Sequence, residues 1–200
     1  MNPDFWHARW NEARTGFHRD SANPALEHWT APDGAHVLVP LCGKSVDLHW
    51  LADRGHRVTG VELSPLACAQ FFEEAGLTPK KEQVGDHVRW STGPYTLLQG
   101  DVFALTGTFD AVYDRAALVA LPPEMRLRYA EVLRRVVRGP GLLVTFEYPQ
   151  HEYSGPPFSV PEDEVMRHFT AERVAEHDMT EEFARRGITS TIQRVYRCSF

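Results

Sequence analysis

The stretch from His36 to Ser64 constrains the fold more than any other part of this chain; it reads HVLVPLCGKSVDLHWLADRGHRVTGVELS. A short apolar run leads to a turn at Gly43, an amphipathic segment follows, and a second apolar run ends at Glu62. Continuous apolar runs of this length are typical of parallel strands that are buried on both faces. The stretch therefore predicts strand, turn, helix and second strand, which is the repeating unit of an α/β fold.

Glu62 marks this unit as a candidate nucleoside-binding site. It follows Gly43 by nineteen residues and lies at the carboxyl end of the second strand, where a carboxylate can accept hydrogen bonds from a ribose diol. A dinucleotide pyrophosphate needs a turn with several glycines, but Gly43 stands alone beside Leu41 and Cys42. The turn suits S-adenosylmethionine better, because that cofactor carries no phosphate. An incidental acidic residue in an ordinary α/β unit is the open alternative.

The rest of the chain continues the alternation of strands and helices. Further strands are expected at 87–91, 95–99, 109–113, 141–148, 173–178 and 189–198, and helices at 4–14, 24–29, 64–75, 122–138 and 161–169. The helix at 122–138 has one apolar face, and its cationic residues are expected on the outer face. The pattern predicts a doubly wound, mostly parallel sheet with an antiparallel edge.

Composition limits the classes to which the protein can belong. Its 200 residues are 42% hydrophobic, which suits a single domain over 1–200. A net charge of −6 without a basic stripe argues against nucleic acid or an anionic membrane as partner. No apolar run is long enough to span a bilayer, and no secretory leader is recognised. The three cysteines show no zinc spacing, so we expect no metal and a cytoplasmic monomer.

Ligands of an open α/β sheet bind beyond the carboxyl ends of its strands. Reading those ends collects the candidate cofactor-binding residues Leu41, Gly43, Glu62, Asp101, Val102 and Arg115. Asp101 and Val102 are expected beside an adenine, although a plain turn after a strand explains them equally well. The Arg115 guanidinium is the candidate catalytic group, because it can bind a cofactor carboxylate or stabilise an anionic acceptor. An ion pair with Asp114 is the structural alternative.

Several segments also carry a resemblance to a known family. The segment VPLCGKSVDLHWLADRGHRVTGVELS resembles the cofactor-binding segment of the thiopurine S-methyltransferases. The resemblance extends to FWHARWNEARTGFH, YDRAALVALPPEMRLRYAEVL and GPPFSVPEDEV, in the same order and over most of the chain. It implies the seven-stranded sheet of class I methyltransferases and S-adenosylmethionine as cofactor.

The resemblance also implies roles for residues outside the strand ends. Trp10 is expected beside the cofactor and Phe17 beside the substrate, on an N-terminal helical lid formed by residues 1–30. Arg115 is expected in the active site, and Phe158 is a candidate wall of the acceptor pocket. The chain departs from the family near its C-terminus, where neither Arg185 nor Arg186 is in register with a second active-site arginine. That role stays unassigned.

The predicted reaction is methyl transfer from S-adenosylmethionine to the sulfur of a small aromatic thiol. In-line displacement depends mainly on alignment, and an acidic thiol needs no strong general base. Cys42 is not expected to be a nucleophile, since no histidine is committed to activating it. The alternatives are methylation of selenium or tellurium oxyanions on the same scaffold, an NAD-dependent oxidoreductase, and a cofactor-binding module without turnover.

Overall fold

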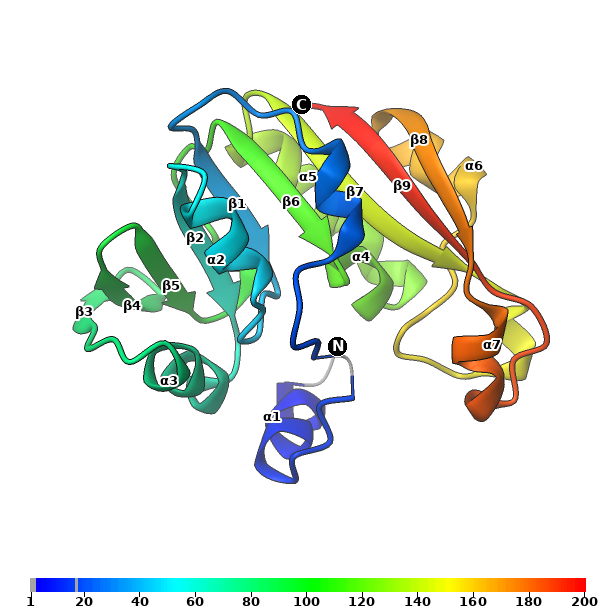
Figure 1. The fold of residues 1–200 in the computed structure, drawn as a ribbon, viewed down its shortest axis with the longest axis horizontal. Coiled ribbons are helices and arrows are strands. Elements are labelled where there is room, and N and C mark those ends of the chain that lie inside the picture. The colour runs from blue at the N-terminus through cyan, green and yellow to red at the C-terminus, as the bar shows by residue number, and fades with distance from the viewer. Residues whose placement is uncertain (1–2, 17) are drawn as a thin grey trace.

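The protein folds into three layers, with helices on both faces of one mixed sheet (Figure 1). The structure is a computed structural model and describes residues 3–16 and 18–200. Within these residues the sheet has nine strands in the order β3-β4-β5-β2-β1-β6-β7-β9-β8. The strands are β1 (His36–Pro40), β2 (Arg57–Glu62), β3 (Lys80–Val84), β4 (His87–Thr92), β5 (Tyr95–Gln99), β6 (Ala111–Arg115), β7 (Pro140–Glu147), β8 (Thr170–Asp178) and β9 (Ile192–Ser199).

The α/β class is confirmed, but the expected number of seven strands is wrong. The five central strands run parallel, and antiparallel strands extend the sheet at both edges. The edge strand β3 was not predicted from the sequence, because KKEQV has no apolar alternation and packs no buried face. It pairs on one side only, with β4. The antiparallel edge expected at the C-terminus is present as β9 and β8.

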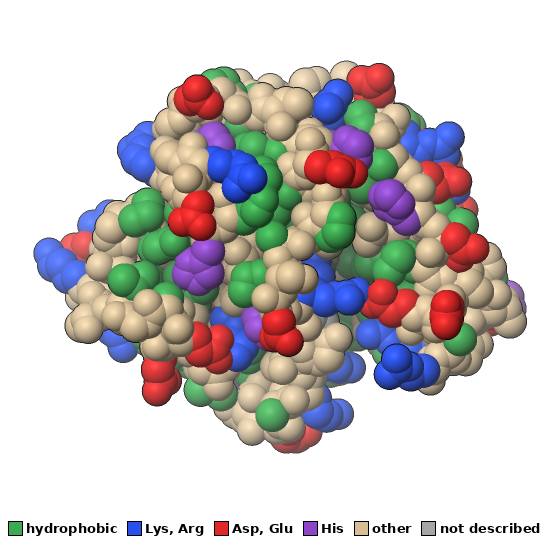
Figure 2. All heavy atoms as spheres, viewed as in Figure 1, with side chains coloured by type: hydrophobic (Ala, Val, Ile, Leu, Met, Phe, Trp, Pro, Cys, Tyr) green, Lys and Arg blue, Asp and Glu red, His purple; other side chains and the backbone are tan. Residues whose placement is uncertain are grey.

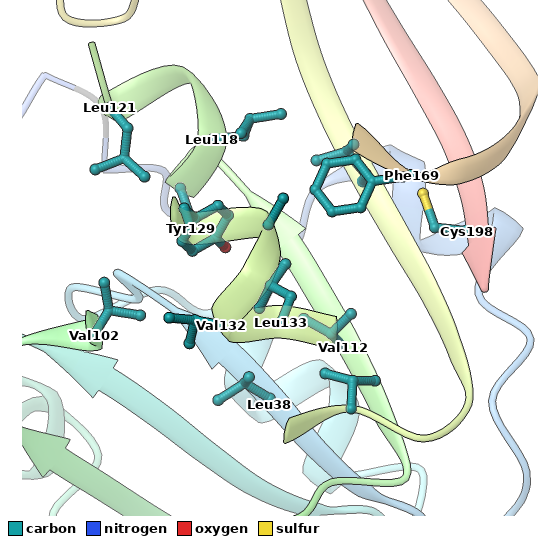
Figure 3. Packing of buried hydrophobic residues seen from close by; sticks show 14 of the residues in the cluster. Leu38, Val102, Val112, Leu118, Leu121, Tyr129, Val132, Leu133, Phe169 and Cys198 are labelled. Atoms are coloured by element: carbon teal, nitrogen blue, oxygen red, sulfur yellow. The ribbon is translucent and has the colours of Figure 1, made fainter. Parts of the chain in front are cut away.

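Strand pleating separates the two large clusters of the core, and a small third cluster consists of Tyr148, Phe183 and Ile188. In β1, Val37 and Val39 pack on one face with η1 (Pro24–His28), α2 (Asp47–Ala52) and α3 (Pro65–Glu74). Leu38 packs on the other face with α4 (Ala117–Ala120) and α5 (Pro123–Val136). Figure 3 shows the second cluster, in which Val132 and Leu133 of α5 lie over the sheet. The α-helices are α1 (Pro3–Asn11), α2 (Asp47–Ala52), α3 (Pro65–Glu74), α4 (Ala117–Ala120), α5 (Pro123–Val136), α6 (Glu162–His168) and α7 (Thr180–Phe183). The 3-10 helices are η1 (Pro24–His28), η2 (Val102–Ala104), η3 (Gln150–Glu152) and η4 (Ala184–Arg186).

One arginine of α5 contradicts the expected cationic outer face. Arg126 is fully buried, with 0% of its surface exposed. Its guanidinium donates to the carbonyl of Leu121 at 2.9 Å, to the carboxylate of Glu164 at 2.8 Å and to the carbonyl of Ser159 at 3.1 Å. A buried cation persists because these acceptors replace water. Arg126 therefore joins the end of α4, the loop before α6, and α6 itself.

Replacing Arg126 by Met is expected to destabilise the fold by about 3–5 kcal/mol, because Glu164 loses its buried partner. The matched control is Arg128→Met on the same helix, where the exposed arginine lies 4.3 Å over the Phe103 ring and should contribute about 1 kcal/mol. Urea denaturation measures both. The double variant Arg126→Met/Glu164→Leu should recover part of the loss, and equal costs for the two single variants would contradict this account.

Candidate active site

The turn after β1 is folded back onto the end of β2. The amide of Cys42 donates to the carbonyl of Val61 at 3.1 Å. Leu41 and Gly43 both adopt left-handed backbone conformations, with φ of 48° and 55°. Leu41 is not glycine, so its conformation carries a strain that the surrounding contacts must offset. The sequence placed both residues in this turn, and the structure confirms that location.

Glu62 closes this turn with its side chain. Its two carboxylate oxygens accept the backbone N–H groups of Gly43 at 2.9 Å and Ser64 at 2.7 Å, while its own carbonyl accepts the N–H of Gly100 at 2.9 Å. The residue is 7% exposed. Burial raises the pKa of the Glu62 carboxyl, and the amide hydrogen bonds oppose that rise. Glu62 thus joins the ends of β1, β2 and β5, and a carboxylate has further lone pairs for a ligand.

Trp10 covers the same turn from the N-terminal helix. A Cβ atom built on Gly43 would lie 3.0 Å from Cζ2 of the Trp10 ring, which is 4% exposed. Helix α1 lies beyond the carboxyl ends of the parallel strands, at the bottom of the view (Figure 1). The structure therefore brings together Trp10, Gly43 and Glu62, which the sequence analysis proposed as one cofactor site. Phe17 lies outside the described residues.

Asp101 and Val102 lie beside this group at the end of β5. Asp101 is exposed, and its carboxylate accepts the N–H of Phe103 at 3.0 Å, which caps the short helix η2. Val102 is buried in the cluster under α5. The hydrogen bond from the Gly100 amide to the Glu62 carbonyl places both residues next to the turn. The cap gives Asp101 a structural role, and the expected contact of the two residues with an adenine stays a prediction.

Arg115 is the last residue of β6, and its neighbours Asp114 and Ala116 form the turn into α4. Ala116 is left-handed, with φ of 79°. The Asp114 carboxylate is buried and accepts N–H groups at the start of α4. Burial raises the pKa of Asp114 to about 6, against the hydrogen bonds from Tyr129 and the two amides. The expected strand 109–113 is displaced by two residues, which puts Arg115 at the strand end.

His18 and Arg19 lie in the N-terminal segment that follows α1. Burial lowers the pKa of the His18 imidazole, and the charges of Lys44 and Arg115 lower it further. The negative charges of Glu74 and Asp20 oppose this lowering. Another residue of the segment, Arg19, forms an ion pair with Glu182 of α7. The segment therefore connects α1, which covers the turn at Gly43, to α7.

The loop after β7 lies against α4, the helix that follows Arg115. The N–H of Phe158 donates to the carbonyl of Val119 in α4 at 2.6 Å. The hydroxyl of Tyr148 donates to the carbonyl of Pro157 at 2.6 Å, and that of Tyr153 to the carbonyl of Pro156 at 3.3 Å. The backbone of Phe158 thus lies beside the helix that follows Arg115, and its role as a pocket wall stays a prediction.

Arg186 also reaches this loop, although the sequence analysis could assign it no role. Its guanidinium lies 5.7 Å from the centre of the Tyr153 ring and 4.9 Å from that of Phe183. Arg185 is exposed in the same 3-10 helix. Tyr153 was missed as a neighbour of the site, because a single tyrosine in a proline-rich loop gives no periodic signal. Figure 2 shows the molecule notched between the α1 and α7 regions, with Lys and Arg side chains around the notch.

The cysteines do not provide an activated nucleophile. Burial raises the pKa of the Cys42 thiol well above its usual range, and the negative charge of Glu62 raises it further. Cys68 and Cys198 are also buried and free. Over residues 3–16 and 18–200, no three His, Cys, Asp or Glu residues are grouped as metal ligands. In the same part of the chain, no helix combines the length and apolar character needed to cross a membrane.

Comparisons with known proteins agree with this geometry. The family model of thiopurine S-methyltransferase matches residues 1–199. The chain belongs to the thiopurine S-methyltransferase family. A thiopurine S-methyltransferase of Xanthomonas campestris is 48% identical over 216 residues, covering 98% of both chains. One from Methylococcus capsulatus is 51% identical over 180 residues, covering 84% of this chain and 81% of the relative.

Solved structures support the fold. A 1,6-didemethyltoxoflavin-N1-methyltransferase of Burkholderia thailandensis, with bound S-adenosylhomocysteine, has a TM-score of 0.65 at 19% identity and covers 99% of this chain and 87% of its own. An S-adenosylmethionine-dependent methyltransferase of Anabaena variabilis has a TM-score of 0.66 at 12% identity, covering 100% and 95%. Membership of the thiopurine S-methyltransferase family confirms the predicted enzyme class and its cofactor, S-adenosylmethionine, over the oxidoreductase alternative.

The contact between Trp10 and the turn predicts a difference between two glycines. Gly43→Ala and Gly55→Ala each force an alanine into a left-handed conformation, but a Cβ at Gly55 meets nothing within 4 Å. Each should lose about 1 kcal/mol of stability. Only Gly43→Ala should also displace Trp10, seen as a shift in tryptophan emission and faster amide exchange in α1. Identical spectra and exchange for the two variants would contradict the contact.

The buried Asp114 carboxyl predicts a specific pH dependence of stability. Its pKa in the folded protein, about 6, lies above its ordinary value of 3.8, so the folded state takes up this proton first as pH falls. The free energy of unfolding of the wild type, relative to that of Asp114→Asn, should therefore increase as pH falls from 7.5 to 4.5. This added stability is lost as pH rises through 6. Urea denaturation at three pH values measures it. The histidines titrate in both proteins and cancel, so a constant difference would contradict the shift.

Proposed function

We propose that this enzyme transfers a methyl group from S-adenosylmethionine to the sulfur of a small aromatic thiol. The observation that supports it most directly is the buried Glu62 carboxylate at a one-glycine turn covered by Trp10, with Arg115 at the carboxyl end of β6 in the same sheet. The names of relatives about half identical to this chain, thiopurine S-methyltransferase, support the thiol as acceptor.

The residues at the turn fit this cofactor. When bound, S-adenosylmethionine supplies a methyl group on a positively charged sulfur. Glu62 would accept the ribose hydroxyls through lone pairs that Gly43 and Ser64 leave free. A turn with one glycine at positive φ offers no cradle for a pyrophosphate, which the cofactor does not carry. Trp10 would shield the reacting edge from water.

The acceptor side supplies charge and apolar walls rather than a base. Arg115 would bind an anionic group of the cofactor or the acceptor through its planar fork. Phe158, on the loop bonded to α4, would pack against an aromatic acceptor. An aromatic thiol is largely thiolate at neutral pH, so alignment by these walls accounts for much of the rate. The assignments of Leu41, Asp101, Val102 and Phe17 belong to the same proposal.

The test begins with calorimetric titration of S-adenosylhomocysteine, with NAD in parallel. Saturable binding of the first compound alone is expected. Glu62→Gln should weaken it about tenfold, since the amide offers one acceptor oxygen in place of two. The matched control is Glu73→Gln on the exposed end of α3, which should bind as the wild type does. Unchanged affinity in Glu62→Gln would remove its ribose role.

The acceptor is tested with a panel of heteroaromatic thiols, beside selenite and tellurite. Methylation of thiols alone supports the proposal, and turnover of the oxyanions alone would replace it. Arg115→Lys should lower turnover about tenfold with little change in melting temperature, because lysine lacks the planar fork. The matched control is Arg185→Lys at an exposed position. Wild-type turnover in Arg115→Lys would leave Arg115 a structural residue.

A further inference from the structure

Asp114 is a buried carboxylate that the proposed reaction does not use. It precedes Arg115 in β6 and is 2% exposed. Successive side chains of a strand point to opposite faces of the sheet, so Asp114 faces the α5 side and Arg115 does not. An isolated carboxylate in such a place is costly, and its retention requires partners that use both oxygens. The structure supplies them.

One oxygen of Asp114 caps the helix that follows Arg115. Oδ1 accepts the N–H of Ala117 at 3.1 Å and that of Leu118 at 3.2 Å. The residue at the usual capping position is Ala116, which has no polar side chain and adopts a left-handed backbone. Asp114 takes over the cap from two residues earlier. The path of the chain through Arg115 and Ala116 is therefore fixed on both sides by one carboxylate.

The other oxygen anchors this turn to α5. Oδ2 accepts the hydroxyl hydrogen of Tyr129 at 2.7 Å, and Tyr129 is fully buried. Three residues after Ala116, the carbonyl of Val119 accepts the N–H of Phe158 from the proposed acceptor wall. A continuous set of hydrogen bonds thus runs from α5 through Asp114 and α4 to the loop of Phe158.

We propose that Asp114 is a positioning residue that holds Arg115 at the reacting edge and, through α4, sets the place of Phe158. The inference rests on the proposed function of these two residues as acceptor contacts. Asp114 itself is buried on the α5 face of the sheet, opposite to the side chain of Arg115. A displacement of about 1 Å at a reacting edge can cost about a hundredfold in rate, so a fixed turn matters for turnover as well as for folding.

The test compares three variants of two aspartates, Asp114 within β6 and Asp110 directly before it. Asp114→Ala removes the cap, and Asp114→Asn keeps one acceptor oxygen for the α4 amides. The control is Asp110→Asn in the residue before β6, where the carboxylate accepts the N–H of His36 at 2.8 Å. Kinetics with the best thiol of the panel are measured well below each melting temperature, together with amide exchange at Leu118 and Phe158.

We expect kcat/KM to fall about a hundredfold in Asp114→Ala and about tenfold in Asp114→Asn, with Asp110→Asn within about twofold of the wild type. Amide exchange at both Leu118 and Phe158 should accelerate in the same order. A folded Asp114→Ala protein with kcat/KM within about twofold of the wild type would overturn the proposal. If Asp114→Ala does not fold, wild-type kcat/KM in Asp114→Asn would do so.

Failure of the proposed function gives a different result. If the wild-type protein methylates no thiol, the proposed acceptor class is wrong. Amide exchange still tests the hydrogen bonds that run from Asp114 through α4 to Phe158. Faster exchange at Phe158 in Asp114→Asn than in Asp110→Asn would then support the positioning role. Equal exchange in the two variants would overturn it.

Discussion

The site depends on the carboxylate of Glu62, which holds the turns at the ends of neighbouring strands together. Its two oxygens accept amides from Gly43 and Ser64, and its backbone accepts the amide of Gly100. These bonds place the ends of β1, β2 and β5 at one edge. Burying a carboxylate costs little free energy only when its oxygens are fully hydrogen-bonded. The donors around Glu62 must therefore hold closely defined positions.

Two buried charged side chains organise the acceptor side in a similar way. Asp114 bonds the start of α4 to α5, and Arg126 bonds the end of α4 to the loop at Ser159 and to Glu164. The short helix α4 therefore has both ends fixed from the same core. This arrangement supports the loop of Phe158, which the proposed role of Phe158 as a wall of the acceptor pocket requires.

The charge at this edge differs from that of the whole molecule. The chain carries a net charge of −6, yet Lys and Arg side chains surround the notch between α1 and α7. Arg115 contributes to lowering the pKa of His18, and Arg186 lies over the Tyr153 ring. Cationic side chains at this edge would help to attract the anionic acceptor that we propose.

The sequence by itself determined the α/β unit around Gly43 and Glu62, because a strand buried on both faces and a glycine turn are local patterns. It also marked Arg115, since the carboxyl ends of parallel strands meet at one edge. It did not reveal β3, whose polar residues carry no periodic signal, or the burial of Arg126. Only tertiary structure decides those, because pairing with β4 and acceptors from Leu121, Ser159 and Glu164 come from distant parts of the chain.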